Sequence, residues 1–226
     1  MNIIHIDSSL KNKGISLAYG LVSGIEVKPS PVIINKKLSQ VEESIRREFE
    51  SGDALSQHPH VKLYRKLLWT FNIDPTKTRP SSEALARRVI RGKPIPRINN
   101  IVDIGNIVSL ETLIPIGLYD YDRINPPLTL TTAKGGEEFE PIGGRKIKLK
   151  QGTPIIKDST GKVVHVYPHR DSIHSMVTES TKTLLVIAAG APGIPVKNLV
   201  QAVNMVINLI KSINPGVIVD ITATPI

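Results

Sequence analysis

The sequence contains no cysteine, which excludes disulfide bonds and thiolate chemistry. Aromatic residues make up only 4% of the 226 residues, so Ile, Val and Leu must supply the hydrophobic core. The longest apolar stretch, residues 184–196, is shorter than the roughly 20 residues of a membrane-spanning helix and contains Gly and Pro. The first residues lack the basic start and apolar run of a signal peptide. We therefore expect a cytoplasmic protein that does not span a membrane.

Acidic residues are also scarce relative to basic ones, with 20 Asp and Glu against 29 Lys and Arg and a net charge of +9. This excess favours a polyanion partner such as RNA, although a basic surface without any partner is the alternative. The 40% hydrophobic and 22% charged residues are ordinary for a folded globular protein. We expect one domain over residues 1–226, made of an N-terminal α/β part (1–75), a motif-bearing core (76–190) and a C-terminal helix and strand (191–226).

Helical patterns recur along the chain. Apolar residues at helical spacing, with an N-cap at Ser39 or Ser81 or with Pro195 at the first position, predict helices over residues 39–49, 60–71, 81–90 and 195–213. A further helix begins at Asn99 or Asn100, which can cap it, and ends before Pro115. Gly105 inside it costs roughly 1 kcal/mol relative to alanine, which indicates that another group approaches the backbone there.

Strand patterns fill most of the remaining chain. Residues 15–27 predict two early strands separated by turns, residues 128–166 an antiparallel region with Gly-Gly turns, and residues 184–187 and 217–221 two later strands. Helices and strands mix without a regular βαβ alternation. We therefore predict an α+β fold with a mixed, largely antiparallel sheet and packed helices.

The sequence contains no clear motif for a metal site or for a catalytic nucleophile. None of the six histidines forms a His-Glu-x-x-His pair, so we expect no metal site and no cofactor. The sequence has no Gly-x-Ser-x-Gly motif, and Asp171, Ser172 and His174 are too close in sequence to be recognised as a triad. A hydrolase with a classical nucleophile is not predicted.

Two basic clusters are candidates for contact with phosphate. The first follows a predicted helix and comprises Arg87, Arg88, Arg91, Lys93 and Arg97. The second lies on a predicted strand, where Lys146, Lys148 and Lys150 alternate with Ile147 and Leu149, so one face should be charged and the other packed. A solvated strand face explains the second cluster as well as a phosphate site does.

A polar tract at residues 168–172 precedes spaced threonines and the apolar strand. Arg170 could bind a phosphate or a carbonyl group, and Ser172 could hold a water molecule or a ribose hydroxyl. The alternative is that Arg170 and Asp171 brace a loop and Ser172 caps a turn.

Three segments resemble one protein family. They are RPSSEALARR at residues 79–88, NNIVDIGN at residues 99–106 and PIGLYD at residues 115–120. The sequence is similar to the editing module of the phenylalanyl-tRNA synthetase β subunit, in its freestanding version, over roughly residues 81–187. The resemblance implies hydrolysis of the ester of wrongly charged tRNA, in trans, without a protein nucleophile. Such a site orients water, stabilises the oxyanion and holds the terminal adenosine.

The sequence departs from the synthetase pattern at three positions. Gly117 stands where the motif has histidine, and Tyr119 stands where it has phenylalanine, while Asp120 is kept. The glutamate that reads a tyrosine hydroxyl would fall near Ile187 or Ala188, but no acidic residue lies between Glu179 and Asp220. We therefore do not expect tyrosine recognition. A nucleic-acid-binding module without turnover is the alternative function.

These arguments define a predicted site, which we expect to bind the acceptor end of tRNA. The predicted catalytic residues are Asn106, Ser109, Gly117, Asp120, Arg170, Asp171 and Ser172. The predicted substrate-binding residues are Ser82, Glu83, Tyr119, Thr178 and Thr181, and the predicted RNA-binding residues are Arg87, Arg88, Arg91 and Lys93.

Overall fold

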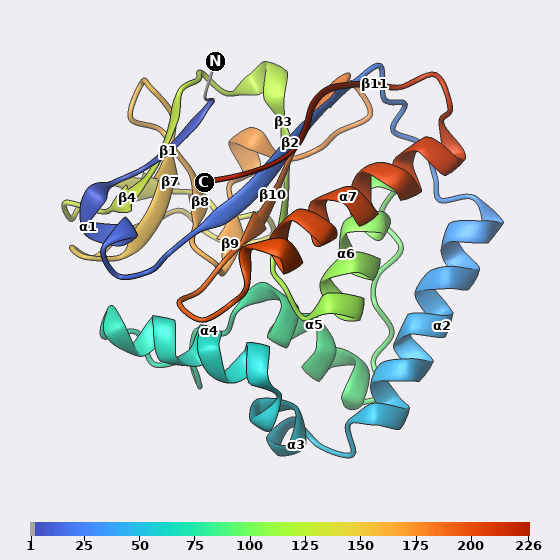
Figure 1. The fold of residues 1–226 in the computed structure, drawn as a ribbon, viewed down its shortest axis with the longest axis horizontal. Helices are drawn as coiled ribbons and strands as arrows, with labels where there is room; N and C mark the ends of the chain where they lie inside the picture. The colour runs from blue at the N-terminus through green and yellow to red at the C-terminus, as the bar shows by residue number, and fades with distance from the viewer. Residues whose placement is uncertain (1–2) are drawn as a thin grey trace.

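The computed structural model describes residues 3–226 as two facing β-sheets, with α2 to α7 on one side and the short α1 beside β1 and β4 (Figure 1). The helices are α1 (Ser8–Lys11), α2 (Val32–Glu48), α3 (Gly52–Gln57), α4 (Pro59–Thr70), α5 (Ser81–Ile90), α6 (Asn100–Thr112) and α7 (Val196–Ile213), with short 3-10 helices η1 (Tyr121–Arg123) and η2 (Ile173–Ser175). The strands are β1 (Ile4–Ile6), β2 (Leu17–Ser23), β3 (Ile116–Asp120), β4 (Leu128–Thr132), β5 (Glu138–Phe139), β6 (Ile147–Lys148), β7 (Pro154–Lys157), β8 (Val163–Val166), β9 (Arg170–Asp171), β10 (Thr183–Ala189) and β11 (Ile218–Pro225).

The strands form two main sheets of largely antiparallel pairs. The first sheet has the order β1-β4-β7-β8-β9, in which only β1 and β4 run parallel. The second has the order β11-β2-β10-β3 and is antiparallel throughout. A separate ribbon pairs β5 with β6. This arrangement confirms the predicted α+β class.

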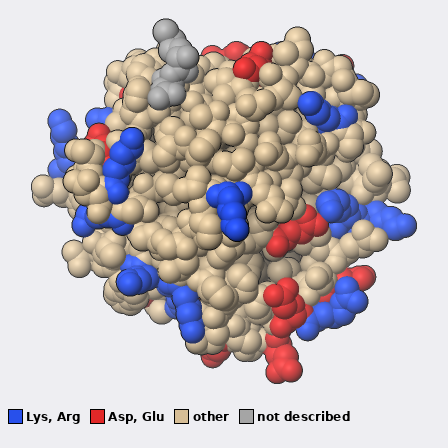
Figure 2. All heavy atoms as spheres, viewed as in Figure 1, with Lys and Arg blue, Asp and Glu red and all other residues tan. Residues whose placement is uncertain are grey.

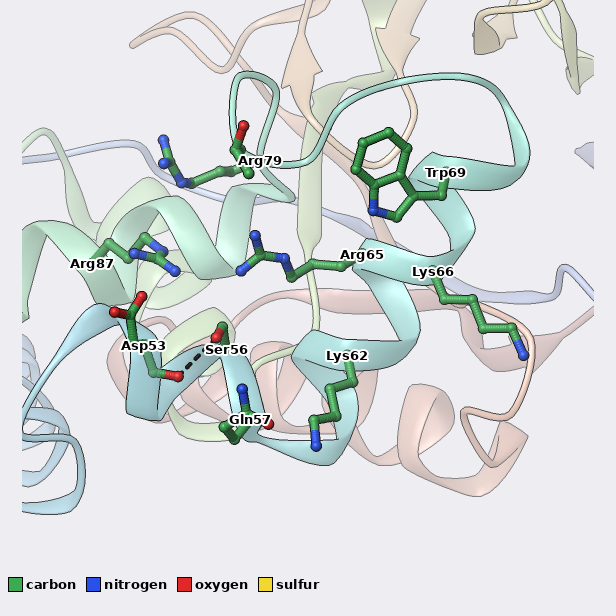
Figure 3. A pocket seen from close by; sticks show the side chains of 10 residues that line it. Asp53, Ser56, Gln57, Lys62, Arg65, Lys66, Trp69, Arg79 and Arg87 are labelled. Atoms are coloured by element: carbon green, nitrogen blue, oxygen red, sulfur yellow. Dashed lines mark hydrogen bonds between the residues drawn. The ribbon is translucent and has the colours of Figure 1, made fainter.

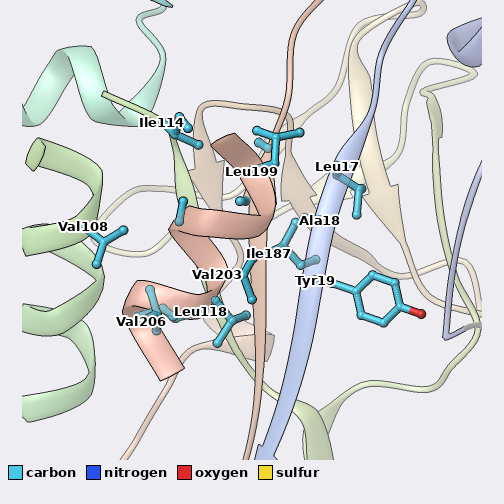
Figure 4. Close-up of a cluster of buried hydrophobic side chains, with 14 of the residues drawn as sticks. Leu17, Ala18, Tyr19, Val108, Ile114, Leu118, Ile187, Leu199, Val203 and Val206 are labelled. Carbon is cyan, nitrogen blue, oxygen red and sulfur yellow. The ribbon is translucent and has the colours of Figure 1, made fainter. Parts of the chain in front are cut away.

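The second sheet is covered on both faces. A Cβ added to Gly20 would lie 3.0 Å from side-chain atoms of Val203 and Ile207, so this face of β2 packs on α7. Because neighbouring residues of a strand point to opposite faces, Tyr19 points away from α7 (Figure 4). The opposite face of the same sheet lies against β7 and β8, as the shared lining of a small cavity shows.

Close packing between α6 and β3 explains the glycine inside a helix. A Cβ on Gly105 would lie 2.5 Å from Cδ1 of Leu118, so alanine does not fit without movement. Figure 4 shows Val108 of α6, Leu118 of β3 and Val203 of α7 in the cluster of buried side chains between the helices and the sheet. The prediction that another group approaches Gly105 is confirmed.

Several predicted helices have the expected bounds. The helix α5 covers residues 81–90, and α6 begins after Asn99, whose side chain accepts hydrogen bonds from the backbone of Ile101 and Val102. The predicted cap at Ser81 is wrong, because the N-cap of α5 is Pro80 and Ser81 is its first residue. No helix among residues 3–226 is long and apolar enough to cross a membrane.

Three other local predictions are corrected. Residues 15–27 contain one continuous strand, β2, because its residues pair with β10 over its whole length. The helix α2 begins at Val32 and not at Ser39. Its N-cap is Pro31, whose side chain makes no capping hydrogen bond, so no Ser, Thr, Asp or Asn at the N-cap marks the true start. The predicted packed face formed by Ile147 and Leu149 is only half present. Leu149 is buried, but Ile147 is exposed, because no other element covers the β5–β6 ribbon at Ile147.

Charge is unevenly distributed over the surface. Figure 2 shows that charged side chains on this face lie mainly toward its edges, while uncharged residues occupy most of its middle.

The substitution Gly105→Ala tests the packing of α6 on β3. Alanine should gain about 1 kcal/mol of helix propensity, but the overlap with Leu118 should cost about 1–3 kcal/mol. We expect a net loss of about 1 kcal/mol in the free energy of unfolding, measured by urea denaturation.

The control is a double-mutant cycle with Leu118→Val, which removes the overlapping δ carbons. The double variant should lose less stability than the sum of the two single variants. Strictly additive losses would show that the contact with Leu118 does not explain the glycine.

Candidate active site and nucleic-acid interface

A small cavity lies between the two sheets. Its volume is about 10 Å³, and its lining comes from both sheets and from the start of α5. The lining residues are Ser81, Pro115, Ile116, Gly117, Tyr119, Ile156, His165, Tyr167, Ile187 and Ala189. Polar side chains of Tyr119, His165 and Tyr167 border an otherwise apolar space, whose volume is far below the roughly 300–1,000 Å³ of an ordinary ligand site.

A histidine–aspartate pair reaches this cavity through its histidine. Nδ1 of His165 lies 2.7 Å from Oδ1 of Asp171, and His165 is buried. The pair forms because His165 on β8 is directly opposite Asp171 on β9 in the antiparallel register. An aspartate that orients a neighbouring histidine is the arrangement of a general base. Sequence reasoning missed His165; the signal is the tight hairpin that joins these two strands.

Two tyrosines surround His165. Their rings meet the imidazole edge-on, at centroid distances of 6.1 Å for Tyr119 and 5.9 Å for Tyr167. Burial, and then the nearby Asp171 carboxylate, hold the pKa of Tyr119 well above its usual value, so its hydroxyl is a neutral hydrogen-bond donor. Tyr167 donates to the carbonyl oxygens of Gly190 at 2.6 Å and Ser16 at 3.2 Å, and burial raises its pKa as well.

Tyr119 also explains the glycine at position 117. Both residues point to the same side of β3, and a Cβ on Gly117 would overlap the Tyr119 hydroxyl and lie 2.6 Å from Cζ of its ring. The tyrosine ring thus occupies the space that a side chain at position 117 would need. The cavity is small because this ring fills it.

The predicted helix residues lie on the other side of β3. Leu118 points toward α6, so Gly117 and Tyr119 point away from that helix, which carries Asn106 and Ser109. Ser109 is buried and accepts a hydrogen bond from the backbone of Ile116 at 3.3 Å. The structure therefore does not bring Asn106 and Ser109 together with His165 and Asp171 at the cavity.

Asp120 and the spaced threonines form an internal link. Oγ1 of Thr181 donates to Oδ2 of Asp120 at 2.7 Å and accepts from the backbone of Thr178 at 2.9 Å. The side chain of Asp120 also accepts a hydrogen bond from the backbone N–H of Asp122, so Asp120 is the N-cap of η1. Because Asp120 and Thr181 are both buried, this link fastens the end of β3 to the start of β10.

The tract around β9 divides into exposed and buried residues. Arg170 is exposed, and its neighbour Asp171 pairs with His165. Ser172 is fully buried and accepts from the backbone of His174 at 3.2 Å, so it caps η2. Two predicted substrate contacts are engaged inside the protein as well: Ser82 donates to the carbonyl of Leu113, and Glu83 binds arginines.

A basic groove runs beside α5. It has a volume of about 270 Å³, and we call it the α5 groove. Its lining is Lys77, Arg79, Ala84, Arg87, Arg88, Arg91, Lys93 and His169, so all four predicted RNA-binding residues line it. Arg87 is held inside the protein by Glu83 at 2.7 Å and the carbonyl of Gly52 at 2.7 Å. Arg88 bonds to the carbonyl of Pro94 through Nε at 2.8 Å and remains exposed.

The groove and the cavity are adjacent. Tyr167 lines the cavity and His169 lines the groove, only two residues further along the chain. Nδ1 of His169 donates to the carbonyl of Arg79 at 2.7 Å, and the backbone of Ser81 donates to the carbonyl of Pro168 at 3.1 Å. These bonds fasten the start of α5 to the turn between β8 and β9. Residues 3–226 contain no group of three or more His, Asp or Glu side chains placed to hold a metal ion.

A family model described as the B3/4 domain matches residues 63–215. The chain belongs to the B3/4 domain family. The matched range runs from α4 to just beyond α7, so it includes the whole lining of the cavity and of the α5 groove.

Curated relatives of this B3/4 domain include β subunits of phenylalanine–tRNA ligase. The subunit of Tropheryma whipplei (strain Twist) is 35% identical over 88 residues, which cover 39% of this chain and 9% of that subunit. The subunit of Pseudoalteromonas translucida (strain TAC 125) is 25% identical over 194 residues, which cover 83% of this chain and 23% of that subunit. The chain thus spans less than a quarter of the length of either relative.

A solved structure is also similar. It is an N-terminal fragment of the phenylalanyl-tRNA synthetase β subunit from Pyrococcus horikoshii. The alignment covers 91% of this chain and 47% of that chain, with 17% sequence identity and a TM-score of 0.47.

The substitution His169→Gln tests how the groove is joined to the cavity. Burial holds the pKa of His169 below its usual value, so the unfolded chain binds this proton more readily than the folded one. The stability of the native protein should therefore fall as the pH drops below about 6.5, the ordinary histidine value. Glutamine keeps an N–H donor for the carbonyl of Arg79 and does not titrate, so the variant should lose less stability on acidification.

The measurement is the urea midpoint at pH values from about 8 down to about 5. His5→Gln, at an exposed histidine on β1, is the matched control. Parallel pH profiles of wild type and His169→Gln would contradict the link between His169 and acid stability.

Proposed function

We propose that this B3/4 domain binds the acceptor end of tRNA and hydrolyses the aminoacyl ester of misacylated tRNA supplied in trans. The observation that carries the proposal is the buried His165–Asp171 pair at a cavity that adjoins a basic groove. The family assignment supports it, since relatives of this chain are subunits of a ligase named for its tRNA substrate.

In the proposed reaction, His165 is the general base and Asp171 orients it. His165 accepts a proton from water as the water oxygen attacks the ester carbonyl carbon. The tetrahedral intermediate then breaks its bond to the ribose oxygen, which takes the proton from His165. Free amino acid and deacylated tRNA are the products. An aminoacyl ester is already activated, so positioned water and hydrogen-bond donors are sufficient without a protein nucleophile.

Substrate entry requires Tyr119 to move. A cavity of about 10 Å³ holds at most one water molecule, so no amino acid fits beside the tyrosine ring. If the ring rotates away, the space above Gly117 becomes available for the amino acid and the ester.

Charged residues outside the cavity hold the nucleic acid in this proposal. Arg88, Arg91 and Lys93 are exposed in the α5 groove and contact backbone phosphates. Arg170 stands next to Asp171 and contacts the tRNA 3′ end. The cavity wall at Ile187 is apolar, so no carboxylate there reads a tyrosine hydroxyl, and other amino acids are the better substrates.

A non-catalytic tRNA-binding module is the second candidate. The specific observation in its favour is the closed cavity, because Tyr119 fills the space above Gly117. The two candidates differ in one measurement. Both predict salt-dependent tRNA binding, but only the first predicts release of amino acid.

The test is incubation with a panel of mischarged tRNAs, followed by measurement of released amino acid. His165→Asn should lower the deacylation rate about 10²- to 10⁴-fold, the range for loss of a general base, with little change in tRNA affinity. His5→Asn is the control at an exposed histidine. Deacylation that survives His165→Asn would place the chemistry elsewhere, and binding without any deacylation would select the second candidate.

Arg170→Ala separates substrate contact from structural support. Loss of a charged hydrogen bond of about 1.5–3 kcal/mol should lower deacylation by roughly one to two orders of magnitude. The melting temperature should change little, because Arg170 is exposed. A variant that unfolds would show that Arg170 braces the β8–β9 hairpin, and an unchanged rate would remove it from the site.

A further inference from the structure

A second basic depression lies on the other side of Arg79 and Arg87, between α3, α4 and α5. It has a volume of about 550 Å³, and we call it the α4 basin (Figure 3). Its lining is Asp53, Ser56, Gln57, Lys62, Arg65, Lys66, Trp69, Thr76, Arg79 and Arg87. Five of these residues are basic and one is acidic, so the basin is strongly cationic.

One buried carboxylate organises the arginines of the α4 basin. Oε1 of Glu83 lies 2.7 Å from Arg87, 3.4 Å from Arg65 and 4.0 Å from Arg79. Glu83 is fully buried, and its charge offsets one of the three guanidinium charges. The arginines are thus held close together, with two positive charges left over at the edge of an open basin.

Such an arrangement is suited to an anion. In Figure 3, Arg65 extends from α4 toward Arg87 on α5, and Arg79 reaches the same region from the preceding loop. A guanidinium that is already fixed loses little side-chain entropy when it binds, and its planar fork matches the oxygens of a phosphate group. Nε of Arg79 is buried and has no hydrogen-bond partner among the described residues.

A tryptophan stands beside these charges. Trp69 is the single tryptophan of the chain, and it is 56% exposed, whereas tryptophan is usually well buried. The exposed residues Lys62 and Lys66 precede it on α4 by two turns and one turn. The packed side of α4 consists of Val61, Tyr64, Leu67 and Leu68, so Trp69 is not part of that packing.

We propose that the α4 basin binds a single-stranded segment of RNA, with phosphates on Arg65 and Arg79 and a base stacked on Trp69. A cationic groove with an exposed aromatic ring is the combination that binds single strands, because every base has a face that can stack. A membrane surface fits the basin poorly, since it is concave and offers one exposed aromatic residue. Binding of single-stranded RNA by the α4 basin does not depend on the proposed deacylation. Only the identification of this RNA segment as part of the tRNA substrate rests on the proposed function.

Trp69 itself reports on the proposal. The probe is an unacylated single-stranded adenylate of about ten nucleotides, within the range bound by single-strand-binding proteins. Its addition to the full chain should quench the tryptophan fluorescence, and binding should weaken as salt is raised. Trp69→Ala should weaken binding of the fluorescently labelled oligonucleotide about 5- to 150-fold, while Trp69→Phe should weaken it less because a ring remains.

Charge variants provide the matched comparison. Lys66→Ala should weaken binding and reduce its salt dependence, whereas Lys211→Ala removes the same charge at the far end of α7 and should have no effect (Figure 1). Trp69 and Lys66 are both exposed, so these variants should keep the wild-type melting temperature. If Lys66→Ala and Lys211→Ala weaken oligonucleotide binding equally, the oligonucleotide binds to surface charge in general and not to the basin. That result would overturn the proposal.

Three competing ligands complete the test. Duplex RNA, polyglutamate and anionic phospholipid vesicles should each leave Trp69 fluorescence nearly unchanged at matched charge. A response to vesicles or to polyglutamate as large as that to the oligonucleotide would overturn the proposal in favour of a membrane or an acidic protein. The probe carries no ester, so loss of Trp69-dependent binding and loss of deacylation are separate results. Either can fail while the other holds.

Discussion

The buried carboxylate of Glu83 connects the helical layer on which both basic surfaces depend. Through three arginines it joins α4, the loop before α5 and α5 itself, and Arg87 continues to the carbonyl of Gly52 at the start of α3. Removing a carboxylate from water costs several kcal/mol, which the surrounding guanidinium groups offset. Without it, the arginines would repel each other and the helices would lose their common anchor. The cluster that anchors the helices is therefore also the one that we propose as an anion site.

The contact between the two sheets defines the second functional region. One face of the β2–β10–β3 surface packs on α6 and α7, while the other face meets β7 and β8 of the first sheet. The His165–Asp171 pair belongs to that first sheet, where it joins β8 to β9. The start of α5 is bonded to the turn between β8 and β9, so the helical layer and the sheet contact are mechanically joined. Movement of that turn would alter the groove and the cavity together.

Local signals in the sequence predicted much of the fold. The helix α5, the cap at Asn99, the helix α7 and the close approach to Gly105 depend on neighbouring residues or on a helix face, so their patterns are visible in the chain. The parallel pairing of β1 with β4 joins segments more than 120 residues apart, and no local pattern specifies it. The first turn of α2 was missed because its N-cap is Pro31, whose side chain makes no capping hydrogen bond, whereas Ser39 inside the helix resembles a cap.

The candidate site was predicted only in part, for a geometric reason. Asn106 and Gly117 lie in neighbouring motifs, but the alternation of side chains along β3 places them on opposite sides of a strand. His165 and Asp171 meet through the register of a hairpin, which composition and spacing do not reveal. The four residues predicted to bind RNA do line one groove, because they follow one another closely along α5 and the turn after it, although their binding to RNA stays a prediction.

The packing of Tyr119 on Gly117 also constrains how this chain can change over evolutionary time. The synthetase-type motif has histidine at the position of Gly117, and any side chain there would collide with the present tyrosine ring. A single substitution cannot restore that histidine, because the ring must first move or become smaller. A mutational path from the present sequence to the synthetase-type motif therefore requires a change at Tyr119 before the change at Gly117. The two positions are coupled, and the order of mutations matters.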